Sequence, residues 1–464
     1  MKKDDYPKLN PLVFSQRRFF ENGGTKSLQL RRQMLKTLKQ VILVEEKAIN
    51  EALKSDLGKS SSETFLSEVG LVLTEIDYFN RHLQQLAKPK RVKNSLINWP
   101  SKDFVVPEPY GVMLHISPWN YPFQLVFTPL IGAIAAGNTV VVKPSELAPN
   151  TADCVEKIIK LVFPPEWVTV IQGGPEVGKS LLEERWDYIM YTGGVRVAKI
   201  VAKEAAKHLT PTMLELGGKN PCVVDHTARI RVTARRIVFG KFLNCGQTCI
   251  APDYILVNES VKEALISAMI TAIEESYGAD ESKSDDYGHI INIHHFDRLK
   301  NLLDRQLIRY GGKTIVKNLY IQPTLVEVND TNNPLMEEEI FGPILPFLTY
   351  QTDEDLQTII KQFEKPLSFY VFSQRKSWAK NLMRTYSYGG GIINDTLLQF
   401  TNRNLPFGGI GKSGMGAYHG KHSFYAFSHN KPYIRRSSWP DPSMRYPPFK
   451  NKMKFLKPLL KWLG

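Results

Sequence analysis

Apolar residues near the start of the chain recur at intervals of three and four, the spacing of one face of an amphipathic helix. This pattern extends over residues 27–57, and Gly58 follows as a stop signal. The apolar positions are Leu30, Met34, Leu38, Val41 and Val44. We therefore predict one long helix over residues 27–57. After Lys88, prolines and asparagines separate two short extended stretches, which predicts a hairpin that projects from the main body.

Strand-like and helix-like segments alternate through the next part of the chain. The predicted strands are 111–117, 139–143, 168–172 and 187–191, and the predicted helices are 125–136, 150–163 and 195–208. Such alternation implies right-handed crossovers and a parallel, doubly wound sheet. A sheet of this kind binds ligands at the carboxyl ends of its strands.

A second α/β unit begins near Thr212 with its own glycine-rich turns. Its predicted strands are 213–216, 222–225 and one within 365–373, and its predicted helix is 264–276. We see no short internal repeat and no low-complexity segment. The hydrophobic pattern therefore predicts an α/β protein with two such units.

Composition adds two constraints to this picture. Of the 464 residues, 42% are apolar and 23% are charged, which is ordinary for a folded protein, and the net charge is +14. The positive charge favours an anionic partner such as a dinucleotide, a nucleic acid or an acidic membrane, or it is simply a solvated basic surface. Four cysteines are too few for a disulfide scaffold, and we find neither a secretory signal nor ~18 consecutive apolar residues. The cytoplasm is the expected location.

One short motif points to a nucleotide hydrolase. Residues 173–180, Gly-Gly-Pro-Glu-Val-Gly-Lys-Ser, match the phosphate-loop pattern between a predicted strand and a helix-like segment. Lys179 would then reach the terminal phosphates. However, Pro175 removes a backbone donor, and Glu176 adds a negative charge where anions should bind. We keep the P-loop nucleotide hydrolase as the weaker, competing hypothesis.

Cys249 is the first candidate for chemistry. It follows Gly246, Gln247 and Thr248, a turn that would expose backbone amides around the sulfur. Amides that point at an anion favour a thiolate and can later hold an oxyanion. The plain alternative is that Cys249 is a small buried apolar residue, which is the commoner fate of a free cysteine.

Two further residues suggest acid–base and oxyanion chemistry. Glu215 ends a predicted strand before two glycines, and an apolar setting there would raise its pKa and suit it as a general base. The alternative is an ion pair between Glu215 and Lys219. Asn120 lies between two prolines and two aromatic residues, so its rigid amide could donate to an oxyanion, or it could simply cap a turn.

Together these motifs resemble the aldehyde dehydrogenase superfamily over nearly the whole chain. The matching landmarks are residues 117–122, 142–146, 215–221, 246–249, 338–343 and 405–409. The likeness is greatest to the class-3, fatty-aldehyde type, on residues 240–242, 247–254 and 413–421 with Phe424 and Phe427. The resemblance implies oxidation of apolar aldehydes, of medium- or long-chain aliphatic, aromatic or polyene type, to carboxylic acids with NAD or NADP.

The resemblance also assigns roles to single residues. Cys249 would be the nucleophile, Glu215 the base for the deacylating water, and Asn120 part of the oxyanion hole. The residues implied in cofactor binding are Lys143, Glu146, Gly193, Gly194, Val197, Leu216, Glu339 and Phe341. Lys143 and Glu146 would hold the adenosine ribose and Glu339 the nicotinamide ribose. No metal site is implied.

The segment that would lie under the pyrophosphate departs from the family pattern. The family usually has Gly-Ser where this chain has Gly193 and Gly194, and a second glycine where it has Ala198. Gly194 loses a hydroxyl contact to phosphate. Arg196 adds a positive charge that could compensate or could favour a phosphorylated ribose. The departure bears on cofactor affinity and leaves the reaction class unchanged.

The resemblance implies a domain plan and partners. Residues 1–88 and 110–214 would form a Rossmann-like, parallel-sheet cofactor domain and residues 215–400 an α/β catalytic domain. Residues 89–109 and 401–435 would form bridging elements with a small β oligomerisation hairpin, in a homodimer without nucleic acid. Residues 436–464 would form a basic amphipathic tail. Met453 and three leucines (Leu456, Leu460 and Leu463) lie on one helical stripe of that tail with lysines among them, so it would either bind the inner face of the membrane or dock on the protein itself.

Two questions stay open from the sequence. Cys245, four residues before Cys249, is either a buried small residue or the partner in a reversible disulfide that protects the nucleophile. The chain is either an active dehydrogenase or an inactivated scaffold that acts as a binding protein. Retention of Cys249, Glu215 and Asn120 favours the active enzyme.

Overall fold

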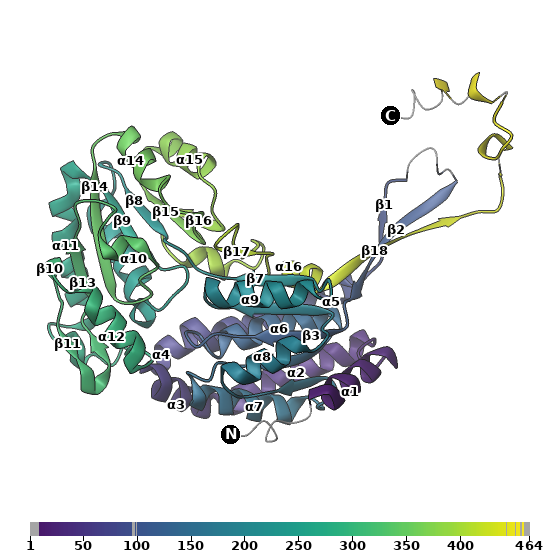
Figure 1. The fold of residues 1–464 in the computed structure, drawn as a ribbon, viewed down its shortest axis with the longest axis horizontal. Coiled ribbons are helices and arrows are strands. Elements are labelled where there is room, and N and C mark those ends of the chain that lie inside the picture. The colour runs from purple at the N-terminus through teal and green to yellow at the C-terminus, as the bar shows by residue number, and fades with distance from the viewer. Residues whose placement is uncertain are drawn as a thin grey trace.

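Alternating strands and helices in the first half of the chain build a six-stranded sheet in the computed structural model (Figure 1). The structure describes residues 9–94, 98, 100–441, 443–450, 452–454 and 457–458. In spatial order the strands are β17 (Gly414–Met415), β7 (Thr212–Glu215), β6 (Tyr188–Thr192), β3 (Val112–Ile116), β4 (Thr139–Lys143) and β5 (Val168–Val170). All neighbours are parallel except β17, which runs antiparallel to β7.

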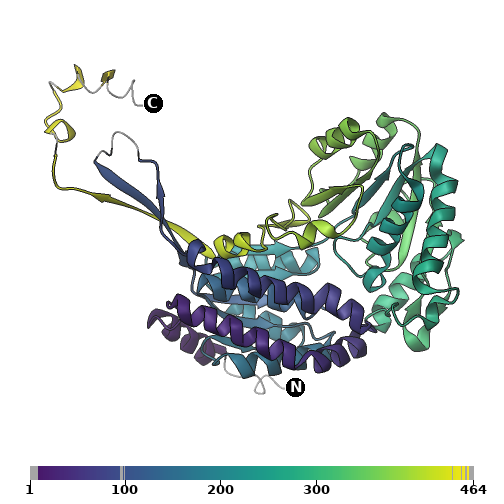
Figure 2. The same cartoon turned by 180° about the vertical axis from the view of Figure 1, so that it is seen from behind.

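Helices cover both faces of this sheet, as the near-continuous apolar strands require. One face carries α2 (Leu28–Val44), α3 (Glu46–Leu57), α5 (Gly70–Leu86), α6 (Gln124–Ala136) and α7 (Pro149–Val162). The other carries α1 (Leu9–Glu21), α8 (Pro175–Glu183) and α9 (Val195–Ala206). Successive strand residues such as Met113 and Leu114 enter opposite cores. Figure 2, viewed from the opposite side to Figure 1, shows the helices α2 and α5 lying across the first of these faces.

The second unit contains a seven-stranded sheet. In spatial order its strands are β10 (Leu307–Tyr310), β13 (Thr324–Glu327), β14 (Ile344–Tyr350), β9 (Tyr254–Asn258), β8 (Pro221–Val224), β15 (Ser368–Phe372) and β16 (Gly390–Ile393). Only β10 pairs antiparallel. Its helices are α10 (Ile230–Phe242), α11 (Lys262–Tyr277), α12 (Ile293–Leu302), α13 (Pro334–Glu337), α14 (Asp353–Ile360) and α15 (Lys376–Thr385). A small ribbon pairs β11 (Thr314–Ile315) with β12 (Tyr320–Ile321).

A three-stranded arm extends from the first unit, at the upper right of Figure 1. The predicted hairpin supplies β1 (Lys90–Val92) and β2 (Ser101–Pro109), and β18 (Ser428–Arg436) follows α16 (Lys421–Ala426) and pairs with the whole of β2. Phe104 and Tyr433 stack across these two strands with ring centroids 5.0 Å apart. The arm therefore joins two segments that are far apart in the sequence.

The structure confirms the predicted α/β fold and corrects one element. The single helix predicted over residues 27–57 is wrong, because the chain breaks at Glu45 into α2 and α3. The break leaves Val44 exposed, although its spacing placed it on the apolar face, and Glu45 forms an ion pair with Lys157 of α7. Within the described part of the chain, no helix is both long and apolar enough to cross a membrane. Leu456, Leu460, Lys461 and Leu463 of the predicted tail lie outside the described residues.

Candidate active site

Four candidate residues lie at the carboxyl ends of strands in the first sheet. Asn120 follows β3, Lys143 ends β4, Gly193 follows β6, and Glu215 ends β7. These strands are parallel neighbours, so their ends meet at one edge of the sheet, where open α/β folds bind ligands.

The turn that carries Cys249 comes from the second unit. It follows α10, and Asn244, Cys245 and Gly246 have positive φ values of 52°, 52° and 72°. The left-handed region costs a residue with a Cβ roughly 1–2 kcal/mol, and asparagine tolerates it best among them. At Gly246 a Cβ would also lie 2.3 Å from the carbonyl oxygen of Gly342. Cys245 is buried and Cys249 is half-buried at the end of this tight turn, and both are free thiols.

Hydrogen bonds hold this turn against both strand-end loops. The Nδ2 of Asn120 donates to the carbonyl oxygen of Gln247 at 3.0 Å, and the hydroxyls of Tyr121 and Thr248 lie 2.6 Å apart. On the other side, the Nδ2 of Asn220 donates to the carbonyl oxygen of Cys249 at 2.8 Å. The structure therefore brings Cys249, Asn120 and the loop after Glu215 together.

The surroundings of the Cys249 sulfur shift the pKa of its thiol in opposite directions. Burial raises the pKa of the Cys249 thiol, and the nearby carboxylates of Glu339 and Glu215 raise it further. The backbone N–H groups of Cys249 and Ile250 point at the sulfur and lower that pKa. Donors placed in this way can stabilise a thiolate and, later, an oxyanion.

Glu215 lies in an apolar environment. Its side chain is 1% exposed, and neither carboxyl oxygen has a hydrogen-bond partner in the described part of the chain. Burial raises the pKa of Glu215 well above its usual range. The alternative ion pair with Lys219 is wrong, since Lys219 bonds to Asp253 at 2.5 Å and to the carbonyl oxygen of Leu335 at 2.6 Å. A buried carboxyl with a raised pKa can exchange a proton near neutral pH.

The residues expected to bind a cofactor line the same edge of the sheet. Lys143 and Glu146 form an ion pair at 2.8 Å. Gly194 caps α9 with no side-chain hydrogen bond and nothing within 4 Å of where a Cβ would be, and the first turn of α9 has no acidic residue. Val197 follows in that helix, half-buried. This helix N-terminus is thus open to an anion.

The remaining cofactor candidates lie nearer to Cys249. The buried Leu216 donates its N–H to the carbonyl oxygen of Ser413 at 3.2 Å. Glu339 accepts a hydrogen bond from the N–H of Gly218, and burial raises the pKa of Glu339 to about 8. Phe341 meets Trp119 edge-on, with centroids 5.4 Å apart. Glu339 therefore lies close to the loop that follows Glu215.

The phosphate-loop motif does not form a phosphate site. Lys179 points to solvent and pairs with Glu176 at 2.8 Å, with both side chains about two-thirds exposed. The helix α8 begins at Pro175. Its Gly178 faces the aliphatic part of Lys143, so α8 packs against the Lys143 side chain. Residues 173–180 therefore pack against Lys143, and Lys179 does not point to the loop amides that would bind phosphate.

Sequence reasoning missed the apolar wall around the nucleophile. Ile250, Leu367 and Leu397 form a buried cluster against which Cys249 packs, together with Leu243, Phe400 and Phe407. Leu367 and Phe407 also line a cavity of about 250 Å³ that reaches Gly389–Gly391 and Gln399. These residues lie in separate loops without periodicity, so only the fold reveals that they meet.

Comparisons with known proteins agree with this geometry. A family model described as the aldehyde dehydrogenase family matches residues 15–432. The chain is 45% identical to 4,4'-diaponeurosporen-aldehyde dehydrogenase of Staphylococcus aureus over 450 residues, 97% of this chain and 98% of that protein. It is 43% identical to aldehyde dehydrogenase family 3 member A2 of Rattus norvegicus over 434 residues, 93% of this chain and 90% of that protein.

A solved structure supports the same relationship. The substrate-bound state of Staphylococcus aureus AldH matches with a TM-score of 0.96 and 44% identity, covering 98% of this chain and all of that one. The class-3 resemblance of the sequence motifs is confirmed by these matches.

Proposed function

The chain belongs to the aldehyde dehydrogenase family, and from this premise we propose that it oxidises apolar aldehydes to carboxylic acids through a thioester on Cys249. That it is an oxidoreductase acting on aldehydes with NAD or NADP follows from the family. The P-loop nucleotide hydrolase is thereby excluded. The observation that carries the proposal is the meeting of Cys249, Asn120 and Glu215 at one edge of the sheet, with the Glu215 carboxyl lacking a hydrogen-bond partner in the part of the chain that is described.

The proposed reaction uses these residues in sequence. The Cys249 thiolate attacks the aldehyde carbon, and Asn120 and the Cys249 N–H stabilise the resulting oxyanion. The chemistry that NAD or NADP would supply when bound is acceptance of a hydride from that carbon. A thioester on Cys249 remains. Glu215 then removes a proton from water, the hydroxide attacks the thioester, and the carboxylic acid leaves as the Cys249 thiolate is restored.

The cofactor residues divide by chemistry. Lys143 and Glu146 would offer a cation and two acceptor oxygens to ribose hydroxyls, and the N-terminus of α9 at Gly194 would hold the pyrophosphate. Val197 and Leu216 supply apolar contact. Glu339 would accept from the nicotinamide ribose once it leaves the N–H of Gly218, with Phe341 packed nearby. The open, uncapped helix end and the paired Lys143 and Glu146 fit a dinucleotide.

An apolar substrate is favoured by the surroundings of Cys249. The cluster of Leu243, Ile250, Leu367, Leu397, Phe400 and Phe407 offers no charge to an incoming aldehyde. The relative named for 4,4'-diaponeurosporen-aldehyde supports a long, apolar substrate of aliphatic, aromatic or polyene type. Each buried methylene contributes about 0.8 kcal/mol, so specificity should rise steeply with chain length until the pocket is full.

Assembly and location complete the proposal. The projecting arm exposes Val92, Tyr433 and Ile434, and it would pair two subunits as a homodimer. The domain limits given above stay predictions. A cytoplasmic enzyme could meet long aldehydes at the inner face of the membrane through its basic tail.

Replacement of Cys249 by alanine tests the mechanism. Cys249→Ala should abolish oxidation and still bind NAD, whereas Cys154→Ala in α7, a thiol that packs in the core under the first sheet and not in the cluster around Cys249, should keep full activity. Turnover is followed by the absorbance of reduced cofactor and NAD binding by fluorescence titration. Substantial turnover in Cys249→Ala would refute the covalent mechanism. Absence of turnover in the unsubstituted enzyme with every aldehyde offered would favour the inactive scaffold.

A graded series of aldehydes tests the substrate class and the tail. The ratio kcat/KM should rise with chain length, and a preference for small or charged aldehydes would refute the apolar class. Deleting residues 449–464 should spare short soluble aldehydes and reduce both binding to anionic vesicles and oxidation of aldehydes embedded in them. Equal loss on both substrate types would show that the tail docks on the enzyme.

A further inference from the structure

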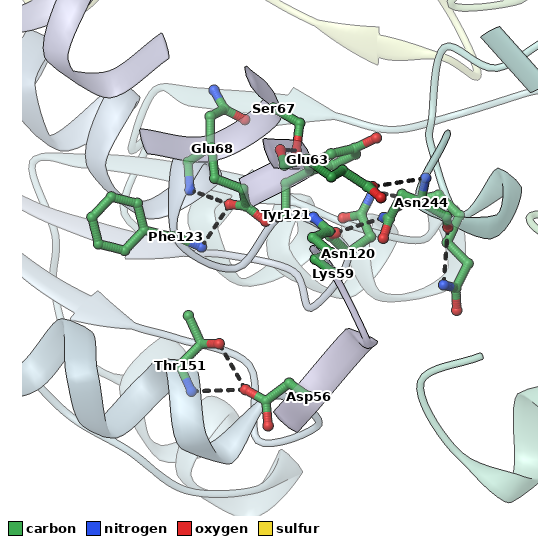
Figure 3. Close-up of polar contacts among 12 residues, drawn as sticks. Asp56, Lys59, Glu63, Ser67, Glu68, Asn120, Tyr121, Phe123, Thr151 and Asn244 are labelled. Atoms are coloured by element: carbon green, nitrogen blue, oxygen red, sulfur yellow. Dashed lines mark hydrogen bonds and ion pairs between the residues drawn. The ribbon is translucent and has the colours of Figure 1, made fainter. Parts of the chain in front are cut away.

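A buried ion pair lies behind the loop of Asn120, apart from the reacting groups (Figure 3). Lys59 follows α3, and Glu68 lies in the π-helical turn Phe65–Val69 between α4 (Ser61–Thr64) and α5. Their charged atoms are 2.5 Å apart, and neither side chain is exposed. Burying two charges costs desolvation free energy, and a protein is often at least as stable with apolar residues of similar size in place of a buried ion pair. The hydrogen bonds of the pair indicate what else it does.

The pair fixes the Asn120 loop at both ends. Glu68 accepts from the N–H groups of Phe123 at 3.1 Å and Gln124 at 2.8 Å, where α6 begins. Lys59 donates to the carbonyl oxygen of Asn120 at 3.3 Å and lies over the ring of Tyr121, 4.1 Å from its centroid. The backbone from Asn120 to Gln124 is therefore held from behind, while the Asn120 amide points toward the Cys249 turn.

A second carboxylate from the same helical segment reaches the Cys249 turn. Glu63 of α4, 7% exposed, accepts from the N–H of Asn244 at 2.9 Å. Asn244 begins the left-handed part of that turn and donates its Nδ2 to the carbonyl oxygens of Asn120 at 2.8 Å and Gln247 at 3.1 Å. The carbonyl of Asn120 thus receives donors from both Lys59 and Asn244, and it links the two loops.

We propose that Lys59, Glu63 and Glu68 are positioning residues that fix the Asn120 amide and the Cys249 sulfur at one relative geometry. The proposal rests on the roles proposed above for Asn120 and Cys249. The two loops come from different α/β units, so no shared strand sets their separation. The segment 59–68 contacts both loops and supplies that constraint. An oxyanion donor must be placed within about 0.5 Å to be effective, and a displacement of ~1 Å from a remote change can cost about 100-fold in rate.

The test compares Glu63→Leu with Glu63→Gln. Glu63→Leu removes the acceptor for the Asn244 N–H, and Glu63→Gln retains an acceptor oxygen without the charge. We expect Glu63→Leu to lower kcat by roughly 10- to 100-fold per active site, with the Kd for NAD unchanged, and Glu63→Gln to recover most of the loss. Active sites are counted by the stoichiometry of NAD binding, which unfolded protein cannot contribute to, so unfolded protein does not enter kcat.

A double variant separates positioning from stability in the ion pair. Lys59→Met with Glu68→Leu fills the same space without charges. Relief from burying two ions should offset the loss of an acceptor for the N–H groups of Phe123 and Gln124, so the melting temperature should stay near that of the unsubstituted enzyme. The pre-steady-state rate of cofactor reduction should still fall, because the Asn120 loop loses its polar anchors while Glu63 still holds the Cys249 turn. A normal rate in this variant would overturn the roles of Lys59 and Glu68.

Asp56→Leu is the matched control. Asp56 is a buried carboxylate, 6% exposed, and it caps α7 by accepting from the N–H of Thr151 at 2.7 Å (Figure 3). Its hydrogen bonds go to Asn150 and Thr151 and to neither loop. It should lose stability and keep kcat per active site. Equal kcat in Glu63→Leu and Asp56→Leu would overturn the role of Glu63. Activity in Cys249→Ala would instead refute the proposed function, so the two failures are distinguishable.

Discussion

The two ends of the proposed active site differ in how their carboxylates are buried and paired. At the reacting end, Glu215 is buried without a hydrogen-bond partner among the described residues, and the nearby carboxylates of Glu339 and Glu215 raise the pKa of the Cys249 thiol. At the ribose end, Glu146 is 36% exposed and paired with Lys143 at 2.8 Å. Burial without an ion-pair partner shifts the pKa of a carboxyl group and so suits it to proton transfer. A carboxylate that is paired and exposed to solvent serves as a hydrogen-bond acceptor. The same residue type therefore has two functions that its surroundings decide.

Removing the carboxylate at the reacting end should have the largest effect. Glu215→Gln keeps the shape of the side chain but cannot remove a proton from water, so turnover should fall by about 10²- to 10⁴-fold. A burst of reduced cofactor should persist, because acylation does not need this base. Rapid-mixing absorbance measures both phases. If the burst disappears together with steady turnover, Glu215 acts before hydride transfer.

The pH dependence of the same variant sharpens the contrast. The raised pKa of Glu215 means that kcat limited by deacylation should rise with pH through an elevated midpoint and be lost below it. The free energy of unfolding depends on pH in the opposite direction to kcat. The protonated carboxyl suits its apolar site, so its contribution is present at low pH and is lost as the pH rises through the folded-state pKa. Thermal melts should show Glu215→Gln gaining stability over the unsubstituted enzyme as the pH rises.

A smaller effect is expected from the carboxylate shared between the two ends. Glu339 raises the pKa of the Cys249 thiol, and its own pKa is raised to about 8. In cofactor-free Glu339→Gln, alkylation of Cys249 by iodoacetamide should therefore be faster, by roughly two- to tenfold above pH 8. The difference should shrink below pH 8, where Glu339 holds its proton. An equal rate at every pH would mean that Glu339 lies too far from the sulfur to act on it.

The sequence predicts best those features of the site that depend on residues close together in the chain. Glu215, Asn120 and Lys143 follow or end predicted strands, and parallel topology alone places such positions at one edge of a sheet. Whether Glu215 pairs with Lys219 could not be settled, because Asp253, the actual partner of Lys219, is 34 residues away. Local patterns thus predict which strand end a residue occupies and leave its partners open.

The elements that sequence reasoning missed depend on distant contacts. Glu63 and Lys59 look like solvated charges in a helical region, yet they bond to residues 181 and 61 positions away. The strand β18 contains Pro432 and mostly polar or basic residues, without alternation, because it is a mostly exposed strand of the arm that pairs with β2. Hydrophobic periodicity reports burial, so it cannot reveal buried charges or exposed strands.

The smallest effect is expected at the ribose end, where the charge is paired and wet. Glu146 can accept from both ribose hydroxyls of NAD, and a 2′-phosphate would meet its negative charge, so NAD should be a usable cofactor. Two like charges at ~4 Å repel by about 1 kcal/mol in water, roughly a fivefold change in rate. Glu146→Gln should therefore raise kcat/KM for NADP relative to NAD by about that factor, and Arg196 in the first turn of α9 would reduce the change by attracting the phosphate. Glu176→Gln is the matched control, since Glu176 also pairs with a lysine three residues away at 2.8 Å but points to solvent, and its cofactor ratio should not move. An enzyme that turns over with NADP alone would refute the assignment of Glu146, because the carboxylate would then lie too far from the ribose to exclude a phosphate.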